Sequence, residues 1–273
     1  MISVNYEPVA INSFTDGTMF LTHPVDFSNW QHIHWNYEDD REIVCLIFLV
    51  KHLRAHGAGK IHLHMDYIPY ARHDRATSSE DVFTLKYFTE ILNSLNLTEV
   101  SVLDPHSYVS EALIKNIRIK SPLQYIERVL VDILPVAGWY VDPEKNKDLP
   151  LTIFYPDEGA MKRYSDIVPF PYAFGVKRRS CETGLIRSLD VVGDVFAIDG
   201  KDVLIVDDIC SSGETALRSA QGLKELGAKD IYLYVTHCEN TILGSELLDS
   251  GLIKKVYTTN SIFTKEHELI EVI

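Results

Sequence analysis

Two adjacent carboxylates, Asp207 and Asp208, follow a short apolar run and precede a segment of small hydroxyl side chains and glycine. That segment, residues 211–215, is expected at the start of a helix, where backbone N–H groups without helical partners can bind a phosphate. The carboxylates can accept hydrogen bonds from vicinal sugar hydroxyls, which a phosphate loop alone does not select. The turn therefore predicts a pocket for a ribose phosphate.

A structural interpretation of the same turn stays open. Ser211 and Glu214 have the spacing of a capping box, in which each side chain accepts a hydrogen bond from the backbone N–H of the other residue. This interpretation leaves Asp207 and Asp208, directly after a buried strand, without a role. We therefore give more weight to ligand binding.

The composition is that of a globular protein, because 46% of the 273 residues are hydrophobic and 24% are charged. The formal net charge of −13 disfavours nonspecific binding to nucleic acid. No apolar run approaches the roughly 20 residues that cross a bilayer, and the N-terminus does not resemble a signal peptide. The four cysteines form no C-x-x-C pair, which suits a reducing compartment. We expect a cytoplasmic protein that has neither nucleic acid nor a membrane as its partner.

Helix-like and strand-like segments alternate along the chain, which is typical of an α/β fold with mainly parallel sheets. Periodicity predicts helices over 40–56 and 79–95, the second capped by Ser79, and a third helix that ends at Gly227. The predicted strands are 61–66, 100–103, 151–155, 172–176, 203–206 and 231–235. The most linker-like stretch, 142–150, predicts a boundary between domains 1–141 and 142–273.

The turn at Asp207 resembles the ribose-phosphate loop of the type I phosphoribosyltransferases. Five further segments, in family order, resemble motifs of the ribose-phosphate pyrophosphokinases. They are Phe14-Thr15-Asp16-Gly17, Pro69-Tyr70-Ala71-Arg72-His73-Asp74-Arg75, Leu103-Asp104-Pro105-His106, Pro156-Asp157-Glu158-Gly159 and Lys177-Arg178-Arg179. Each segment alone has an ordinary structural explanation, but their joint order makes the resemblance specific, and with weaker similarity beyond them it covers nearly the whole chain.

The resemblance implies two similar phosphoribosyltransferase-like domains, the first with the ATP motifs and the second with the catalytic and ribose-phosphate loops. It implies Mg²⁺-dependent transfer of the pyrophosphoryl group of ATP to the anomeric 1-hydroxyl of ribose 5-phosphate, in a homodimer or higher homo-oligomer. The implied ATP site consists of Phe14, Asp16, Arg72, His73, Asp74 and His106, with Phe14 and Asp16 from a neighbouring subunit. His106 and Asp157 would organise Mg²⁺, and Lys177 and Arg179 would act from a mobile loop. The implied ribose-phosphate site consists of Asp207, Asp208, Ser211, Ser212, Gly213 and Thr215.

Three residues depart from the family pattern: Thr18 replaces a glutamate, His73 replaces a glutamine, and Glu214 replaces a small glycine. A carboxylate disfavours a 5-phosphate dianion more than a diphosphate bridge with about one charge per phosphate, so ADP-ribose stays open as the acceptor.

Two further alternatives are a base-transferring phosphoribosyltransferase and an inactive regulatory homologue. The segment 72–75 argues against the first alternative, and the retained Lys177 and Arg179 argue against the second. His62 and His64 lie on one strand face, and we expect a structural pair there because no third metal ligand is evident.

Overall fold

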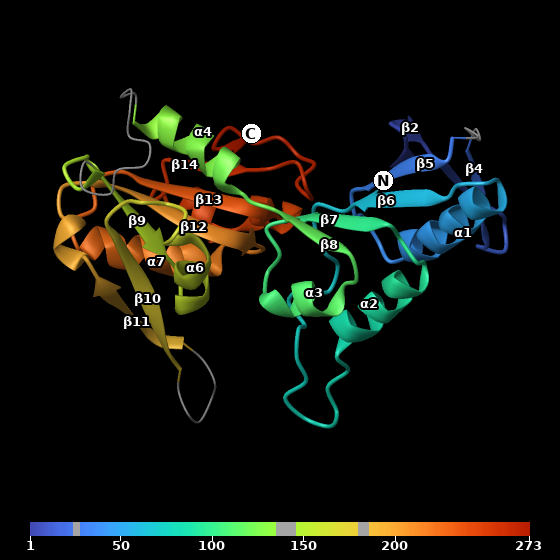
Figure 1. Cartoon of the computed structure of the whole chain (residues 1–273). Coiled ribbons are helices and arrows are strands. Elements are labelled where there is room, and N and C mark those ends of the chain that lie inside the picture. The colour runs from blue at the N-terminus through green and yellow to red at the C-terminus, as the bar shows by residue number, and fades with distance from the viewer. Residues whose placement is uncertain (24–27, 135–145, 180–185) are drawn as a thin grey trace. The chain divides into compact units, whose positions relative to one another are not determined.

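The computed structural model describes residues 1–23, 28–134, 146–179 and 186–273, and for residues 177–179 and 186–189 it describes the backbone alone. The chain divides into two compact units, Met1–Ser121 and Pro122–Ile273. Each unit is built around its own sheet (Figure 1). Within the described ranges, no helix is both long enough and apolar enough to cross a membrane.

The main sheet of the first unit has the strand order β2-β1-β5-β6-β7-β8, and its strands β5 to β8 run parallel. Alternate residues of β5 and β6, such as Ile33 and Leu63, are fully buried in one core with residues of helices α1 and α2. Figure 1 shows α1, α2 and α3 on the same side of this sheet. The strands are β1 (Ile2–Val4), β2 (Glu7–Pro8), β5 (Trp30–Trp35), β6 (Lys60–His64), β7 (Glu99–Leu103) and β8 (Ile117–Lys120). The helices are α1 (Arg41–Ala55), α2 (Thr84–Ser94) and α3 (Tyr108–Leu113), and β3 (Ala10–Ser13) and β4 (Met19–Thr22) form a separate hairpin.

The other face of this sheet carries a ladder of four histidines. His32 and His34 on β5 are register partners of His62 and His64 on β6. The rings of His34 and His64 stack with centroids 4.6 Å apart, and His32 Nδ1 lies 3.2 Å from His64 Nε2. Burial and the neighbouring His34 lower the pKa of His64 to about 4. This imidazole is therefore uncharged at neutral pH.

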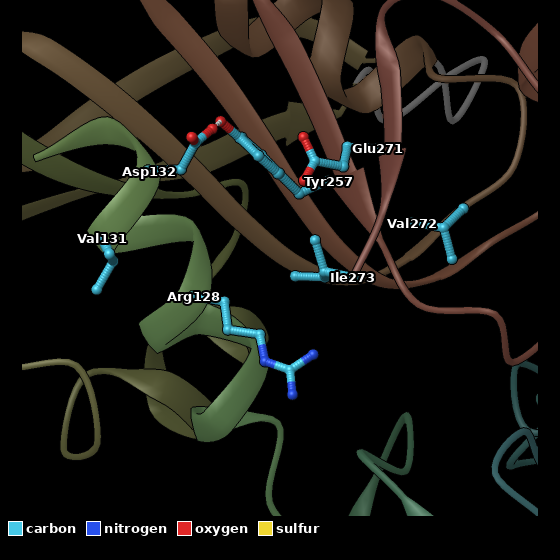
Figure 2. A pocket seen from close by; sticks show the side chains of 7 residues that line it. All are labelled: Arg128, Val131, Asp132, Tyr257, Glu271, Val272 and Ile273. Carbon is cyan, nitrogen blue, oxygen red and sulfur yellow. Dashed lines mark hydrogen bonds between the residues drawn. The ribbon is translucent and has the colours of Figure 1, made fainter. Parts of the chain in front are cut away.

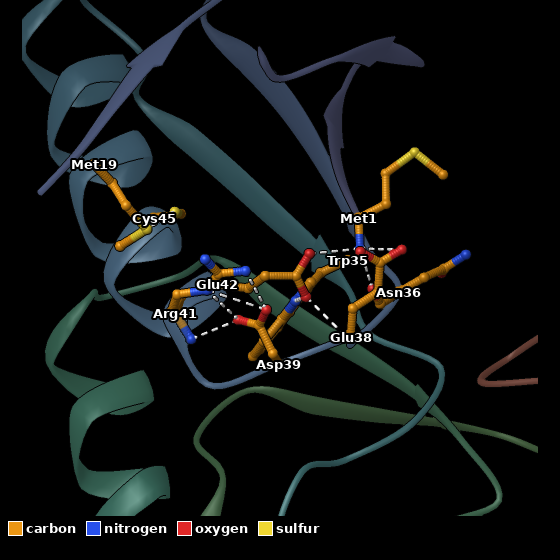
Figure 3. Close-up of polar contacts among 9 residues, drawn as sticks. All are labelled: Met1, Met19, Trp35, Asn36, Glu38, Asp39, Arg41, Glu42 and Cys45. Atoms are coloured by element: carbon orange, nitrogen blue, oxygen red, sulfur yellow. Dashed lines mark hydrogen bonds and ion pairs between the residues drawn. The ribbon is translucent and has the colours of Figure 1, made fainter. Parts of the chain in front are cut away.

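Glu42 joins helix α1 to the sheet. Its buried carboxylate accepts hydrogen bonds from the Trp35 indole N–H at 2.9 Å and from the Glu38 backbone N–H at 2.8 Å. The N-terminal ammonium of Met1 forms an ion pair with the same carboxylate (Figure 3). One side chain thus links β1, β5 and the first turn of α1.

The sheet of the second unit has the strand order β11-β10-β9-β12-β13-β14-β15, and β10 and β11 are its antiparallel pair. Both faces are buried, as is usual for a mainly parallel sheet. Val203 and Ile205 pack with Ala220 and Leu223 of α7 on one face, while Leu204 packs with residues of α4 and α6 on the other. The strands are β9 (Leu151–Tyr155), β10 (Tyr172–Arg179), β11 (Ile186–Gly193), β12 (Asp202–Cys210), β13 (Ile231–Cys238), β14 (Lys255–Thr258) and β15 (Ile270–Val272). The helices are α4 (Leu123–Ile133), α6 (Glu158–Tyr164), α7 (Glu214–Glu225) and α8 (Glu246–Asp249), with 3-10 turns η1 (Val195–Ala197) and η2 (Asn240–Gly244).

The structure confirms the predicted fold class, because both units have mainly parallel sheets flanked by helices. The division between the units falls before α4, whose Ile126 and Leu130 share a core with Leu151 of β9. The domain boundary predicted between residues 141 and 142 lies in a stretch outside the described residues.

Helix α2 starts later than predicted, at Thr84, with Phe83 as its N-cap. The prediction that Ser79 caps this helix is wrong. The residues before it form a separate turn, in which the Asp81 carboxylate accepts a hydrogen bond from the Thr77 backbone N–H at 2.8 Å.

Candidate functional site

The predicted ribose-phosphate loop, residues 211–215, joins the end of β12 to the start of α7. Gly213 is the N-cap residue of α7 and has a φ of +74°, a conformation that favours glycine. A Cβ atom at this position would lie 3.0 Å from Leu247 Cδ2 of α8. The loop conformation and its close packing against α8 therefore both favour a glycine here.

Arg163 on α6 contacts both carboxylates that precede the loop. Its Nη2 donates a hydrogen bond to Asp208 Oδ1 and lies 3.7 Å from Asp207 Oδ1. The Asp208 side chain is 3% exposed, whereas the Asp207 side chain is 18% exposed. Asp207 is therefore the more exposed of the two carboxylates, and Asp208 is the one that pairs most closely with the guanidinium.

The pKa of Asp207 is raised well above its usual value. Burial is the largest cause, the carboxylates of Asp208 and Asp157 add to it, and Arg163 opposes it. Grouped carboxylates with shifted pKa values are common where a site receives a cation or holds a proton. Asp207 is thus placed to accept a hydrogen bond from a hydroxyl or to contact a cation.

Asp157 begins helix α6 as its N-cap. Its Oδ1 accepts a hydrogen bond from the Ala160 backbone N–H at 3.0 Å, which satisfies one amide of the first turn. In the part of the chain that is described, no three His, Cys, Asp or Glu side chains are arranged as ligands of one metal ion. The role of His106 and Asp157 with Mg²⁺ stays a prediction.

Ser211 and Glu214 do not form the capping box that the sequence allows. Ser211 Oγ donates a hydrogen bond to Glu239 Oε2 at 2.7 Å. Glu214 instead accepts a hydrogen bond from Arg218 Nη2, one turn further along α7, at 2.8 Å. The capping-box interpretation is wrong because each side chain has a charged partner elsewhere. Two carboxylates, those of Glu214 and Glu239, thus belong to the surroundings of the loop.

Sequence reasoning missed Arg163 and Glu239. Arg163 follows Asp157 on the same short helix, so an arginine after the acidic motif was the available signal. Glu239 directly follows β13, where Cys238 is the register partner of Cys210 on β12. Since neighbouring parallel strands end at the same sheet edge, the residue after β13 was a candidate neighbour of the loop.

The backbone of Lys177 to Arg179 lies in strand β10, where Lys177 pairs with Leu189 of β11. The expectation that Lys177 and Arg179 lie on a loop is therefore corrected for their backbone. The pairing becomes irregular between Arg178 and Arg179, at the end of the strand. The structure places the backbone of both residues near the end of β10, and their side chains lie outside what it describes.

In the first unit, Phe14 and Asp16 lie on the connection between β3 and β4. Asp16 Oδ1 accepts hydrogen bonds from the Thr18 backbone N–H at 2.9 Å and the Thr18 hydroxyl at 2.7 Å. These hydrogen bonds lower the pKa of Asp16. The Phe14 ring is 58% exposed and packs on Phe20 with centroids 4.6 Å apart. Thr18, one of the departures from the family pattern, therefore orients Asp16.

The segment 69–75 follows β6, and His106 follows the neighbouring parallel strand β7. Both segments therefore leave the sheet at the same edge. His73 Nδ1 lies 2.9 Å from Thr84 Oγ1 at the start of α2, and Arg75 Nε lies 3.7 Å from Asp74 Oδ1. The first unit thus gathers the predicted ATP residues of these two segments at one sheet edge.

A cavity of about 550 Å³ lies between α4 and the strands β14 and β15 (Figure 2). The Tyr257 hydroxyl donates a hydrogen bond to Asp132, and Lys255 Nζ lies 3.2 Å from the same carboxylate. Arg128 also lines the cavity. It contains none of the predicted site residues, so we do not assign it to the candidate site.

Comparisons with known proteins identify relatives of this chain. A family model described as "Phosphoribosyl synthetase-associated domain" matches residues 183–271. The ribose-phosphate pyrophosphokinase of Bacillus subtilis is 28% identical over 235 residues, which cover 85% of this chain and 69% of the relative. That of Thermococcus kodakarensis is 31% identical over 207 residues, which cover 74% of this chain and 66% of the relative. The chain belongs to the ribose-phosphate pyrophosphokinase family.

The similarity covers the whole chain. The ribose-phosphate pyrophosphokinase of Saccharolobus solfataricus is 25% identical over an alignment that covers 100% of this chain and 90% of the relative. The phosphoribosylpyrophosphate synthetase of Mycobacterium smegmatis, a solved structure, has a TM-score of 0.76 at 18% identity, over 97% of this chain and 85% of that one. This likeness shows the shared fold. As a member of the ribose-phosphate pyrophosphokinase family, the protein is an enzyme of the diphosphokinase class.

Proposed function

We propose that this enzyme transfers the β,γ-pyrophosphoryl group of ATP to the anomeric 1-hydroxyl of a ribose 5-phosphate unit. The hydroxyl oxygen forms a bond to the β-phosphorus, the bond from that phosphorus to the α,β-bridging oxygen breaks, AMP leaves, and the hydroxyl proton is released. The observation that carries the proposal is the pair Asp207 and Asp208 directly before the loop 211–215, one reachable and one paired with Arg163. Family relatives are named for this activity.

In this reaction the residues of the second unit position the acceptor. Asp207 accepts a hydrogen bond from a ribose hydroxyl, and Arg163 holds the two carboxylates in place. The first N–H groups of α7 bind the phosphate of the acceptor. The proposed ribose-phosphate residues are Asp207, Asp208, Ser211, Ser212, Gly213 and Thr215. Positioning of this kind is a major part of catalysis in phosphoryl transfer.

The proposed ATP site belongs to the first unit, with the hairpin residues Phe14 and Asp16 supplied by a neighbouring subunit. Its other residues are Arg72, His73, Asp74 and His106. Lys177 and Arg179 neutralise charge on the phosphate oxygens during transfer, when such contacts contribute most.

Mg²⁺ fits the donor set of the second unit. Asp207 and Asp157 influence each other electrostatically, and one or two carboxylates together with substrate phosphates are the ligands that Mg²⁺ prefers. We propose that Asp157 organises the ion, which when bound would neutralise charge on the ATP phosphates, and the family resemblance assigns the same role to His106.

One observation favours a larger acceptor than ribose 5-phosphate. The Ser211 hydroxyl donates a hydrogen bond to Glu239 Oε2, and Thr241 Oγ1 lies 3.4 Å from the same oxygen. A negative charge beside the loop disfavours a terminal phosphate dianion more than a diphosphate bridge. ADP-ribose, which would yield ADP-ribose pyrophosphate and connect the enzyme to NAD metabolism, is therefore the second candidate acceptor.

We also propose that the enzyme works as a homodimer or higher homo-oligomer in the cytoplasm. The exposed hairpin residues Ile11, Phe14 and Phe20 support an interface with another subunit. Light scattering at assay concentration tests this part, and full specific activity in a monomer contradicts it.

The deciding experiment incubates the enzyme with ATP, Mg²⁺ and either ribose 5-phosphate or ADP-ribose. AMP and the pyrophosphorylated product are resolved by chromatography and mass spectrometry. We expect AMP and product in equal amounts with at least one acceptor, and none when the acceptor is left out. Formation of ADP and phosphate, or no acceptor-dependent AMP, would refute the proposed reaction.

A further inference from the structure

A cavity of about 500 Å³ adjoins the predicted ribose-phosphate loop and is lined by residues of α7, η2 and α8. Ser212 and Glu214 belong to the loop and also line the cavity, so the cavity lies directly beside the loop. Arg218 and Gln221 of α7 also line the cavity, as do Gly244, the last residue of η2, and Ser245, the N-cap of α8. The volume lies within the range of about 300–1,000 Å³ that small-molecule sites occupy.

Ser245 is a polar residue with an unfulfilled hydrogen-bonding capacity. Its residue surface is 7% exposed, and its Oγ has no hydrogen-bond partner among the described atoms. The same Oγ would lie 3.5 Å from a Cβ placed on Gly213, next to the loop. Because buried hydroxyls nearly always have a partner, this oxygen keeps the capacity for a hydrogen bond to a ligand atom.

The charges of the cavity set the kind of ligand. The Arg218 and Glu214 side chains pair at 2.8 Å and are 47% and 66% exposed, so their contact is a weak one that a ligand phosphate can replace. Glu246 adds a second carboxylate to the lining. A terminal phosphate dianion meets repulsion there, whereas a diphosphate with about one charge on each phosphorus meets less.

The remaining lining suits a nucleoside. The Gln221 amide offers two donors and an acceptor for the edge of a base, and the Leu217 side chain supplies an apolar contact. The carboxylates of Glu214 and Glu246 can accept hydrogen bonds from ribose hydroxyls. No single feature selects a nucleoside, but donors, acceptors and an apolar wall occur together in one cavity beside a phosphate loop.

We propose that this cavity is an acceptor subsite that binds a nucleoside 5′-phosphate group attached through a diphosphate bridge to the ribose held at Asp207. ADP-ribose has this chemistry. The inference rests on the proposed function, since it names the substrate class of the same site. In this proposal Ser245 and Gln221 determine the specificity for the acceptor. On binding, the Arg218 side chain leaves Glu214 and pairs with a phosphate of the ligand.

The test fills the cavity without straining the backbone. At Gly244 a Cβ meets nothing within 4 Å and no positive φ is recorded, so Gly244→Leu places a side chain in open space. Gly222→Leu is the matched control, because Gly222 on α7 also has open space but does not line the cavity. We expect Gly244→Leu to weaken ADP-ribose binding at least tenfold by calorimetry without ATP, and Gly222→Leu to change it less than twofold.

A second variant removes the hydroxyl alone. Ser245→Ala should weaken ADP-ribose binding about fivefold and lower the ratio of kcat/KM for ADP-ribose to that for ribose 5-phosphate. Equal loss with both acceptors, or ADP-ribose binding unchanged in Gly244→Leu, would overturn the subsite.

The two proposals fail in different ways. If ADP-ribose binds and Gly244→Leu abolishes the binding, but no acceptor yields AMP, the proposed reaction fails and the subsite stands. If ribose 5-phosphate yields AMP while ADP-ribose does not bind, the subsite fails and the reaction stands.

Discussion

Replacing Arg163 with methionine tests whether this residue holds the two acceptor-site carboxylates. The Arg163 side chain is 15% exposed and its partner Asp208 is 3% exposed. Removing one member of such a buried ion pair costs about 3–5 kcal/mol, because the other charge stays buried without compensation. We expect Arg163→Met to lower the free energy of unfolding by about 3 kcal/mol at pH 7, measured by urea denaturation with far-ultraviolet circular dichroism.

The loss of stability in Arg163→Met, compared with the wild type, should depend on pH. Arg163 opposes the rise in the pKa of Asp207, so its removal raises that pKa further. A carboxyl group whose folded pKa is raised binds more protons in the folded state, so its contribution to stability decreases as pH rises above the unfolded value of 3.8. The difference between Arg163→Met and wild type should therefore be smaller at pH 5 than at pH 7.

The neighbouring residue gives a matched control. Lys162 Nζ pairs with Glu158 Oε1 at 2.8 Å, but these side chains are 62% and 65% exposed. Exposed pairs of this kind contribute about 0–1 kcal/mol, so Lys162→Met should change stability by less than about 1 kcal/mol. Adding Asp208→Asn to Arg163→Met should restore at least about 1 kcal/mol, since it removes the uncompensated charge. A loss below about 1 kcal/mol for Arg163→Met, or no recovery in the double variant, would refute the reasoning.

Gly213→Ala should lower the free energy of unfolding by about 2 kcal/mol in urea denaturation, because the position combines a positive φ with a close contact to α8. The control Gly222→Ala should instead stabilise α7 by about 0.5–1 kcal/mol. The same effect at both positions would contradict this reasoning. Because the pKa of His64 is lowered, the unfolded chain binds more protons, and stability should decrease as pH falls from 6.5 towards 4. After allowance for solvent screening, His64→Gln should reduce by about 1 kcal/mol the stability that is lost between pH 7 and pH 5. His56, which is exposed, gives the control His56→Gln, which should leave this loss unchanged. Lys177→Ala should lower kcat about 10²-fold or more while ATP binding persists, and turnover within about threefold of wild type would exclude the proposed role.

Local sequence signals predicted much of the fold. Gly57 and Gly227 were read as helix ends, and both have positive φ values after α1 and α7. The apolar strand before Asp207 and the small residues after it correctly predicted a strand, a loop and a helix. These features depend on neighbours in the chain, so periodicity and turn chemistry were sufficient.

The contacts around the site depend on tertiary structure and escaped the sequence. Ser211 had a local acceptor in the capping-box interpretation, but the pairing of β12 with β13 brings Glu239 to it instead. Arg163 reaches Asp208 from a helix 45 residues away in the chain. Likewise, α4 packs with the second unit through a shared core with Leu151 and through the Tyr257 hydrogen bond to Asp132, contacts that no local sequence signal predicts.

Strand β12 and the connection after its neighbour β13 contribute different residues to the surroundings of the predicted loop, so the two segments could evolve independently. Asp207 and Asp208 belong to β12, whose backbone is fixed within the sheet, while Glu239, Thr241 and Gly244 belong to the connection that follows β13. Under the proposed assignment, replacing that connection changes the surroundings of the acceptor phosphate without moving the two carboxylates proposed to bind its sugar. If the proposed assignment holds, grafting residues 239–246 into a relative exchanges the acceptor preference while strand β12 and its carboxylates stay in place.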